Sequence, residues 1–217
     1  MNMTRMTIAE FMYQCRLRIV NSIEDQNIQQ ATVQLGYTPE RLEEGRALLD
    51  ASTALCERYD KEYGEVTAAF DQRNKEKEAA DEQFKIYLTV AKVALKNNQA
   101  ALTTLQLNQR MPRTFSGWLN KTRGFYNNLL NNPEWMTEMA KFNTTEAQLK
   151  QGLDTVKKVE GFAEVIMREK GDAQNATKER DAKLEELNEW INDYESIAKI
   201  ALMAQPQLLE KLGIVVK

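Results

Sequence analysis

Histidine is absent from the 217 residues of this chain, and its absence excludes several chemistries. Ser-His-Asp and Cys-His nucleophile systems, HExxH metal sites, carboxylate–histidine di-iron bundles and haem bound by a proximal histidine all require an imidazole. The motifs GxxxxGK[ST], GxGxxG and CxxC are also missing, so the sequence contains no recognisable phosphate-binding loop or zinc knuckle. We therefore expect a protein that is not an enzyme, with no catalytic, cofactor-binding or metal-binding residues.

Glycine and proline are also scarce, with nine and four residues. Because these residues interrupt helices, while the abundant Ala, Glu, Lys, Gln and Leu favour them, the composition predicts an all-α fold. A hydrophobic content of 42% is enough for one or two compact domains with a core. The formal charge of −3 gives no support for nucleic-acid binding driven by net charge, so no nucleic-acid partner is expected.

The chain has two cysteines and no long apolar run. Cys15 and Cys56 lie among apolar residues at helical spacing, which predicts small buried side chains rather than a disulfide or a reactive thiol. No run approaches 18 apolar residues, so we expect no helix that spans a membrane. The first residues lack the apolar core and cleavage site of a secretory signal, and the expected location is the cytoplasm.

The sequence matches itself at an offset of 107 residues. Without a gap, 20 of the 101 aligned pairs are identical, whereas unrelated sequences of this composition would share roughly 6%. The clearest match sets YLTVAKVAL (87–95) over YESIAKIAL (194–202). We predict a tandem duplication with repeats 1–107 and 108–217, packed as one integrated bundle around a pseudo-twofold axis.

Matched capping signals divide each repeat into helices. Thr7 and Glu10 form a predicted capping box, and the apolar spacing after them predicts a helix to about residue 24. A short helix is expected near 26–35 and again near 133–142. The remaining signals are Gly36 and Asn143 just past these short helices, Thr38 and Thr145 before the next ones, and Leu102, Leu105, Leu209 and Leu212 in a last short helix of each repeat.

An unbroken alternation of three and four residues runs through 39–97 and 146–204 and predicts a coiled-coil-like seam. The middle of each segment is mostly polar, at 71–79 and 174–183. Two interpretations remain open: one long helix in each repeat, or a helical hairpin that turns in the polar stretch or at the matched glycines. The rarity of such long helices favours the hairpin, and the lack of a turn signal slightly favours the long helix.

The seam carries an arginine in both repeats, Arg73 and Arg180. If the long segments pair antiparallel, Tyr59 and Tyr63 lie at the level of Leu184 and Arg180. We expect the aliphatic part of each arginine side chain to lie along the seam and its guanidinium group to pair with a carboxylate. The alternative is a contact between the guanidinium group and an anion or a partner. The carboxylates expected to serve are Glu62, Glu65, Glu169 and Asp172.

A basic segment follows the first repeat at 110–123. Basic residues interleaved with aromatic ones can bind single-stranded nucleic acid. The aromatics fall on the predicted core face of a helix, however, so core packing plus linker charge is the favoured interpretation. The basic residues are Arg110, Arg113, Lys121 and Arg123, and the aromatic ones are Phe115, Trp118, Phe125 and Tyr126.

The two repeats, each closing on YxxxAKxAL, and the ending QLLEKLGIVV resemble a group of uncharacterised bacterial two-repeat, all-helical proteins. This resemblance covers nearly the whole chain and implies the fold, but it supplies no activity and no site residues. We predict a non-enzymatic helical interaction or scaffolding protein that binds a protein partner or itself. The alternatives are a helical bundle that binds a ligand in an apolar pocket, and a nucleic-acid or membrane-surface binder that uses the basic segment.

Overall fold

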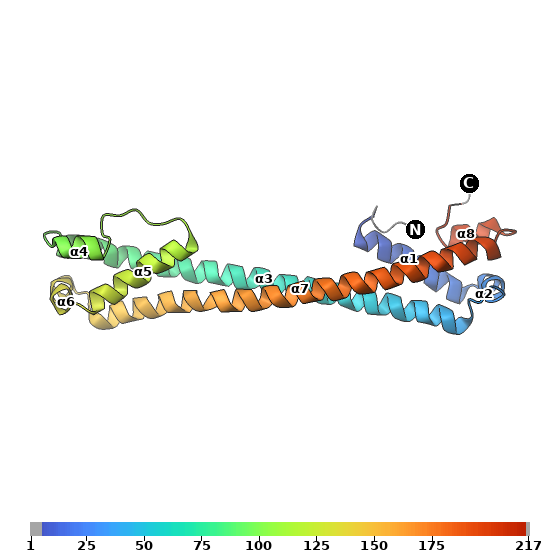
Figure 1. The fold of residues 1–217 in the computed structure, drawn as a ribbon, viewed down its shortest axis with the longest axis horizontal. Coiled ribbons are helices and arrows are strands. Elements are labelled where there is room, and N and C mark those ends of the chain that lie inside the picture. The colour runs from blue at the N-terminus through green and yellow to red at the C-terminus, as the bar shows by residue number, and fades with distance from the viewer. Residues whose placement is uncertain (1–5, 216–217) are drawn as a thin grey trace. The chain divides into compact units, whose positions relative to one another are not determined.

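A computed structural model describes residues 6–215, and within that range the chain is helical and contains no strand (Figure 1). The all-α prediction is therefore confirmed. In chain order the helices are α1 (Ile8–Glu24), α2 (Gln26–Val33), α3 (Pro39–Ala94), α4 (Gln99–Thr104), α5 (Phe115–Leu130), α6 (Pro133–Ala140), α7 (Glu146–Ala201) and α8 (Pro206–Lys211).

The predicted caps set the helix ends. The Thr7 hydroxyl accepts a hydrogen bond from the backbone N–H of Glu10 at 3.2 Å, at the start of α1. Gly36 (φ 87°) and Asn143 (φ 55°) adopt the left-handed conformation after α2 and α6, as predicted. Both short helices end two residues earlier than expected, because residues 34–36 and 141–143 already form the turn.

The long segments are continuous helices. α3 and α7 each contain 56 residues and run without a break through Gly64 and Gly171 and through the polar stretch 71–79. The hairpin interpretation is therefore wrong. One glycine costs a helix only about 1 kcal/mol, and none of the polar residues in the stretch stops a helix.

Helices in the second half begin 107 residues after those in the first. The starts of α1 and α5 differ by 115 − 8 = 107, and those of α3 and α7 by 146 − 39 = 107. The same difference separates α2 from α6 (133 − 26) and α4 from α8 (206 − 99). We call the residue 107 positions away in the other half the counterpart of a given residue.

The chain packs as two compact units, and their boundaries differ from those of the predicted repeats 1–107 and 108–217. Unit 1 comprises the described residues of Met1–Tyr63 and Gly171–Lys217, and unit 2 comprises Gly64–Lys170. Each unit thus combines one part of repeat 1–107 with one part of repeat 108–217. The unbroken long helices explain this division, because neither helix turns back on its own repeat.

In unit 1, the N-terminal helices α1 and α2 pack with α8 on the first part of α3 and the last part of α7 (Figure 1). The Asn21 amide donates a hydrogen bond to the Lys211 carbonyl at 2.6 Å, which ties α1 to α8. The two long helices run antiparallel within the unit, since Ser52 bonds to the Lys183 carbonyl at 3.5 Å and Arg58 pairs with Glu179 at 2.5 Å. The larger core residues include Phe11, Ile19, Tyr37, Leu42, Ile191, Tyr194 and Leu212.

In unit 2, helices α4, α5 and α6 pack on the last part of α3 and the first part of α7. The Trp118 indole N–H donates to Asp81 at 2.9 Å, and Lys158 pairs with Glu76 at 2.7 Å across the antiparallel long helices. The larger core residues include Phe84, Trp118, Phe125, Tyr126, Leu149 and Val156. The aromatics of the basic segment are thus core residues here, apart from the half-buried Phe115.

None of the helices in residues 6–215 combines the length and the apolar character that crossing a bilayer requires.

Candidate functional site

A groove of about 620 Å³ lies between α1 and α3 in unit 1. It is open to solvent rather than closed, and the Tyr13 side chain at its edge is 60% exposed. We call it the α1–α3 groove. Its lining residues are Ile8, Ala9, Met12, Tyr13, Arg16 and Val20 from α1, Arg46, Leu49, Asp50, Thr53, Cys56, Glu57, Tyr59 and Asp60 from α3, and Arg180 from α7.

Helical periodicity builds both walls of the groove. On α1 the lining residues recur every four positions from Ile8 to Val20, and on α3 they recur every three or four positions from Arg46 to Asp60. Each helix therefore presents one continuous stripe to the groove. The buried or half-buried residues form the floor, namely Met12, Val20, Leu49, Cys56 and Tyr59, and the exposed residues form two rims.

The α3 rim is acidic. Asp50, Glu57 and Asp60 are exposed and lie on one face of the helix, and none of them forms an ion pair with any other residue in 6–215. The α1 rim carries Arg16, which likewise has no ion-pair partner in that range. The fifth rim charge, Arg46 on α3, is 3.6 Å from Glu43 on its own helix. The groove thus has an apolar floor between an acidic rim and a cationic one.

Arg180 lies at one end of the groove. Its guanidinium lies 4.0 Å from the centre of the Tyr59 ring and donates to Asp181 at 2.9 and 2.7 Å. Tyr59, one of the two tyrosines expected at the level of Leu184 and Arg180, thus contacts Arg180. Because Asp181 is the partner, the prediction that Glu62, Glu65, Glu169 or Asp172 would pair with this arginine is wrong.

Arg73, the other seam arginine, lies in unit 2 and has no carboxylate among its described hydrogen-bond and ion-pair partners. It donates to the Asn74 side chain at 3.3 and 2.8 Å, and its guanidinium lies 4.9 Å from the ring centres of Phe70 and Phe115. Aromatic faces therefore take the place that we assigned to carboxylates. A half-buried guanidinium can keep part of its hydration, and it then needs no buried counterion.

The counterpart of the groove in unit 2 is bridged. Arg123 and Glu160, the counterparts of Arg16 and Thr53, form an ion pair at 2.7 Å that joins α5 to α7. In unit 1 the Thr53 hydroxyl instead donates to the Leu49 carbonyl at 2.9 Å on its own helix. The exchange of Glu for Thr therefore leaves Arg16 without a bridge and the unit 1 groove open.

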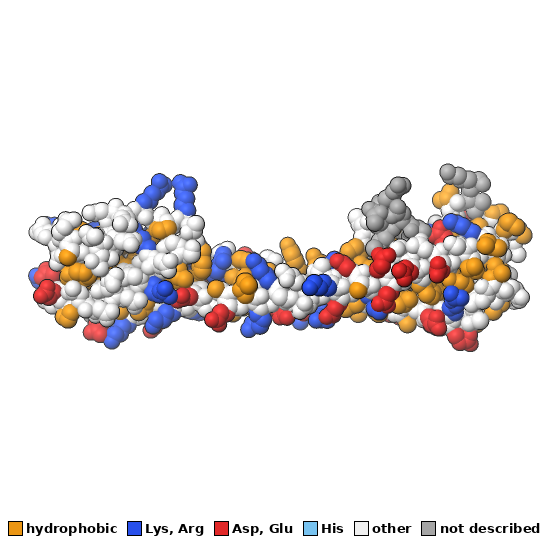
Figure 2. Space-filling model, in the orientation of Figure 1, with side chains coloured by type: hydrophobic (Ala, Val, Ile, Leu, Met, Phe, Trp, Pro, Cys, Tyr) orange, Lys and Arg blue, Asp and Glu red, His pale blue; other side chains and the backbone are white. Residues whose placement is uncertain are grey.

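The basic segment is not a continuous cationic surface. Lys121 is 5% exposed and donates to the Gln109 carbonyl at 2.6 Å and the Arg110 carbonyl at 3.5 Å, and burial lowers its pKa. Arg123 is paired with Glu160. Arg110 and Arg113 are exposed, on the segment between α4 and α5 where basic side chains project in Figure 2. Lys121 thus holds the linker in place, and of the four basic residues named from the sequence only Arg110 and Arg113 are exposed.

The two cysteines differ in burial, and only Cys15 is buried as the sequence predicts. Cys15 is buried in the unit 1 core, and burial raises its pKa to about 12. Cys56 is half-buried in the floor of the α1–α3 groove, and burial raises its pKa also. Both thiols are therefore protonated near neutral pH and are poor nucleophiles.

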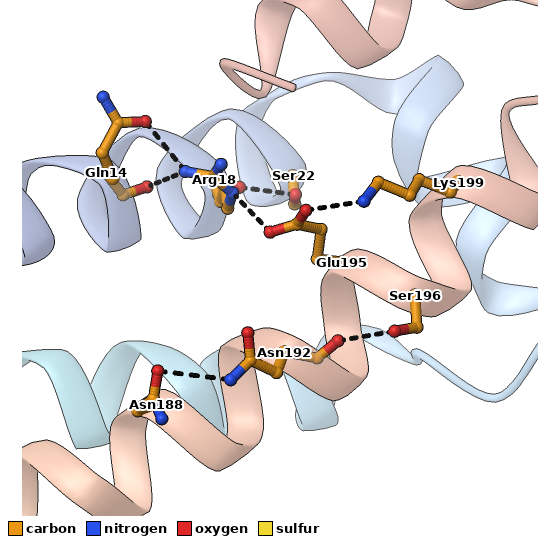
Figure 3. A network of polar contacts seen from close by, with 8 residues as sticks. All are labelled: Gln14, Arg18, Ser22, Asn188, Asn192, Glu195, Ser196 and Lys199. Carbon is orange, nitrogen blue, oxygen red and sulfur yellow. Dashed lines mark hydrogen bonds and ion pairs between the residues drawn. The ribbon is translucent and has the colours of Figure 1, made fainter. Parts of the chain in front are cut away.

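A buried ion pair between α1 and α7 is a second polar feature of unit 1 (Figure 3). Arg18 Nε lies 3.6 Å from Glu195, and the two side chains are 6% and 11% exposed. The guanidinium also donates to Gln14 at two atoms, and Lys199 contacts Glu195 at 2.7 Å. Burial opposes ionisation of Glu195, but these positive charges and hydrogen bonds leave its pKa lowered. Such a network favours one packing of α1 on α7.

The residues of the groove and of the ion pair were not predicted from the sequence as site residues. The available signal was the comparison of the two halves at each position. Thr53 aligns with Glu160, and Arg18 and Glu195 align with the apolar Phe125 and Leu88. At these aligned positions the helical pattern is the same in both halves, but the charge of the side chain differs. Such a difference indicates a position where the two halves form different polar contacts.

No family model, curated protein or solved structure matches the chain. The resemblance to bacterial two-repeat helical proteins therefore stays a prediction.

Proposed function

We propose that this protein is a non-enzymatic interaction or scaffolding protein, built by tandem duplication, whose binding site is the α1–α3 groove of unit 1. The observation that carries the proposal is the open groove, with an apolar floor and unpaired charges on both rims. Grooves of this type between two helices are a common way to bind a segment of another protein.

The duplication is supported by three features. The helix starts differ by 107 residues throughout, and the caps of α1 and α5 are both threonines, Thr7 and Thr114. The boundaries of the two units, at Gly64 and Gly171, are also counterparts. Duplication gives a protein two copies of one surface, and a binding site can then evolve in one copy while the other keeps a structural role.

The two alternative functions have weaker support. A bundle that binds a small ligand calls for an enclosed cavity with converging polar groups, whereas this groove is open to solvent. Binding of nucleic acid or of an anionic membrane calls for a cluster of exposed cations. In the basic segment, Lys121 is buried and Arg123 is paired, so the cluster reduces to Arg110 and Arg113.

Photocrosslinking tests the proposal at matched positions. A photoreactive amino acid is placed at Ala9 on the groove rim, or at its exposed counterpart Ser116 in unit 2, in the full-length protein within its native cells. We expect a discrete protein adduct from position 9 and none from position 116. Equal adducts from both positions, or none from either, would overturn the assignment of the groove. Turnover of a metabolite that one polar substitution abolishes would overturn the non-enzymatic function.

A further inference from the structure

The α1–α3 groove also indicates the chemistry of its occupant. We propose that it binds an amphipathic helix of a partner protein, with lysine or arginine along the flank that faces α3 and a carboxylate on the flank that faces Arg16. This inference rests on the proposed function and specifies the class of partner.

The shape of the groove suits a helix. Its α1 wall extends from Ile8 to Val20, twelve steps along the chain or about 18 Å, which equals three to four turns of a docked helix. Both walls present side chains at three- and four-residue spacing, the arrangement into which the ridges of a third helix pack. The apolar stripe of that helix would cover the floor residues Met12, Leu49 and Cys56.

The charges of the α3 rim select a basic flank. Asp50, Glu57 and Asp60 are spaced seven and three residues apart, so all three face the same side of the groove. In unit 2 the counterparts are Lys157, Glu164 and Met167, whose charges sum to zero. The acidic rim is therefore particular to unit 1. None of its three carboxylates forms an ion pair within residues 6–215. Charges that flank an apolar stripe in this way determine partner choice and orientation in helix pairs.

Arg16 selects the carboxylate on the opposite flank. Its counterpart Arg123 shows how an arginine at this position is satisfied, through the 2.7 Å pair with Glu160 across the groove. Because Thr53 stands where Glu160 would be, the corresponding anion must come from the occupant of the groove. A glutamate or aspartate on the docked helix supplies it.

Two model peptides test the charge requirement. Both are about 14 residues long and place leucine at helical spacing. The leucine–lysine peptide carries lysine along one flank of the leucine stripe and a glutamate on the other flank, to pair with Arg16, and the leucine–glutamate peptide carries glutamate at all polar positions. Fluorescence anisotropy of each labelled peptide is measured against the full-length protein. We expect saturable binding of the leucine–lysine peptide and binding at least about tenfold weaker for the leucine–glutamate peptide. Equal affinities, or no binding of either peptide, would overturn the inference.

The variant Thr53→Glu separates the groove from simple charge attraction. It copies the unit 2 residue, lets Arg16 pair across the groove and should weaken binding of the leucine–lysine peptide by about tenfold. General electrostatic attraction predicts the opposite sign, because the substitution adds a negative charge. Thr53 is exposed and glutamate favours helix, so the variant is expected to fold, which a circular-dichroism melt checks.

Two further variants complete the design. Glu160→Thr opens the bridge in unit 2 and should leave the affinity unchanged. Asp50→Lys combined with Asp60→Met gives the α3 rim its unit 2 residues and should abolish the preference for the lysine peptide. Tighter or unchanged binding by Thr53→Glu would overturn the inference. An adduct at position 9 that persists alongside such a result would leave the groove as the binding site and reject only this class of partner.

Discussion

Arg18 and Glu195 form a buried ion pair in unit 1, whereas their counterparts in unit 2 are Phe125 and Leu88, which belong to an apolar core. The same helical pattern, with the same caps and the same spacing, therefore accommodates two different chemistries at one pair of positions. A buried ion pair and a well-packed apolar pair can support similar stability, since desolvation offsets most of the charge attraction. The comparison teaches that the capping residues and the spacing of apolar residues specify the helices. Two core residues that contact each other can differ together between the units without changing those helices.

Removing one member of the buried ion pair should have the largest effect on stability. Glu195→Leu, which introduces the unit 2 residue, leaves the Arg18 guanidinium buried without its counterion and should reduce the free energy of unfolding by about 3 kcal/mol. Adding Arg18→Phe to it completes the exchange and should bring stability back to within about 1 kcal/mol of the original protein. Urea unfolding followed by circular dichroism measures both variants.

The control for this prediction is Lys199→Leu, which removes an exposed partner of Glu195 and should cost less than about 1 kcal/mol. Acid provides a second readout. Because the folded-state pKa of Glu195 is lowered from its ordinary value of 4.5, its contribution is present above pH 4.5 and is lost as the pH falls through the folded value. The double variant lacks this carboxylate and should lose less stability over that range. A double variant as unstable as Glu195→Leu would contradict the proposed equivalence of the two pairs.

Matched glycines admit different aromatic residues in the two units, and this difference gives a smaller effect. A Cβ at Gly45 would lie 2.5 Å from Cζ2 of Trp190, and a Cβ at Gly152 would lie 2.7 Å from the Tyr126 ring. Gly45→Ala should therefore reduce the free energy of unfolding by about 1 to 3 kcal/mol through overpacking, even though alanine favours helix. Thermal melts measure the change.

The matched control for Gly45→Ala is Gly161→Ala, where no atom lies within 4 Å of the added methyl group. This variant should gain about 0.5 to 1 kcal/mol from helix propensity alone. Combining Gly45→Ala with Trp190→Gln, the residue found at the unit 2 counterpart Gln83, should show a favourable coupling in a double-mutant cycle. Additive effects would mean that Trp190 and Gly45 do not depend on each other.

Most of the fold was accessible from the sequence because its signals are local. The capping residues Thr7 and Thr145 and the turn residues Gly36 and Asn143 act within four residues of themselves, and the structure has them as predicted. The choice between a hairpin and a long helix was not accessible. That choice depends on which segment the polar stretch 71–79 packs against, because the residues of the stretch are compatible with both a hairpin and a long helix.

The candidate site was less accessible, because it depends on pairs of residues distant in sequence. Arg18 shares the spacing of Phe11, Cys15 and Ser22, so its position on the core face could have been predicted, but its partner Glu195 lies 177 residues away. The groove is likewise open because the residue across from Arg16 is Thr53, which cannot form an ion pair, and not a carboxylate. For the seam arginines, carboxylate partners were predicted from charge alone, whereas both guanidinium groups also lie against aromatic rings.

The seam arginines should give the smallest effect, and they test whether the two units use these residues alike. Arg73→Leu and Arg180→Leu each lose a contact with an aromatic ring that contributes about 0.5 to 1 kcal/mol, and the leucine recovers a similar amount through apolar burial. Asp181, the carboxylate that Arg180→Leu leaves behind, is 57% exposed and stays hydrated, so no buried charge is orphaned.

The double variant Arg73→Leu with Arg180→Leu should therefore melt at the original temperature or slightly above it. Of the two single variants, Arg180→Leu should have the larger effect of either sign, because that side chain is only 12% exposed and the Arg73 residue is half-buried. A melting temperature lowered by more than about 5 °C, which for a chain of this size means more than about 1 kcal/mol, would contradict the prediction. Such a loss would mean that the contacts of the two guanidinium groups with Tyr59, Phe70 and Phe115 hold the long helices together, or that the arginines bind an anion. Repeating the melt in phosphate buffer distinguishes these outcomes, since only a bound anion would make the loss depend on phosphate concentration.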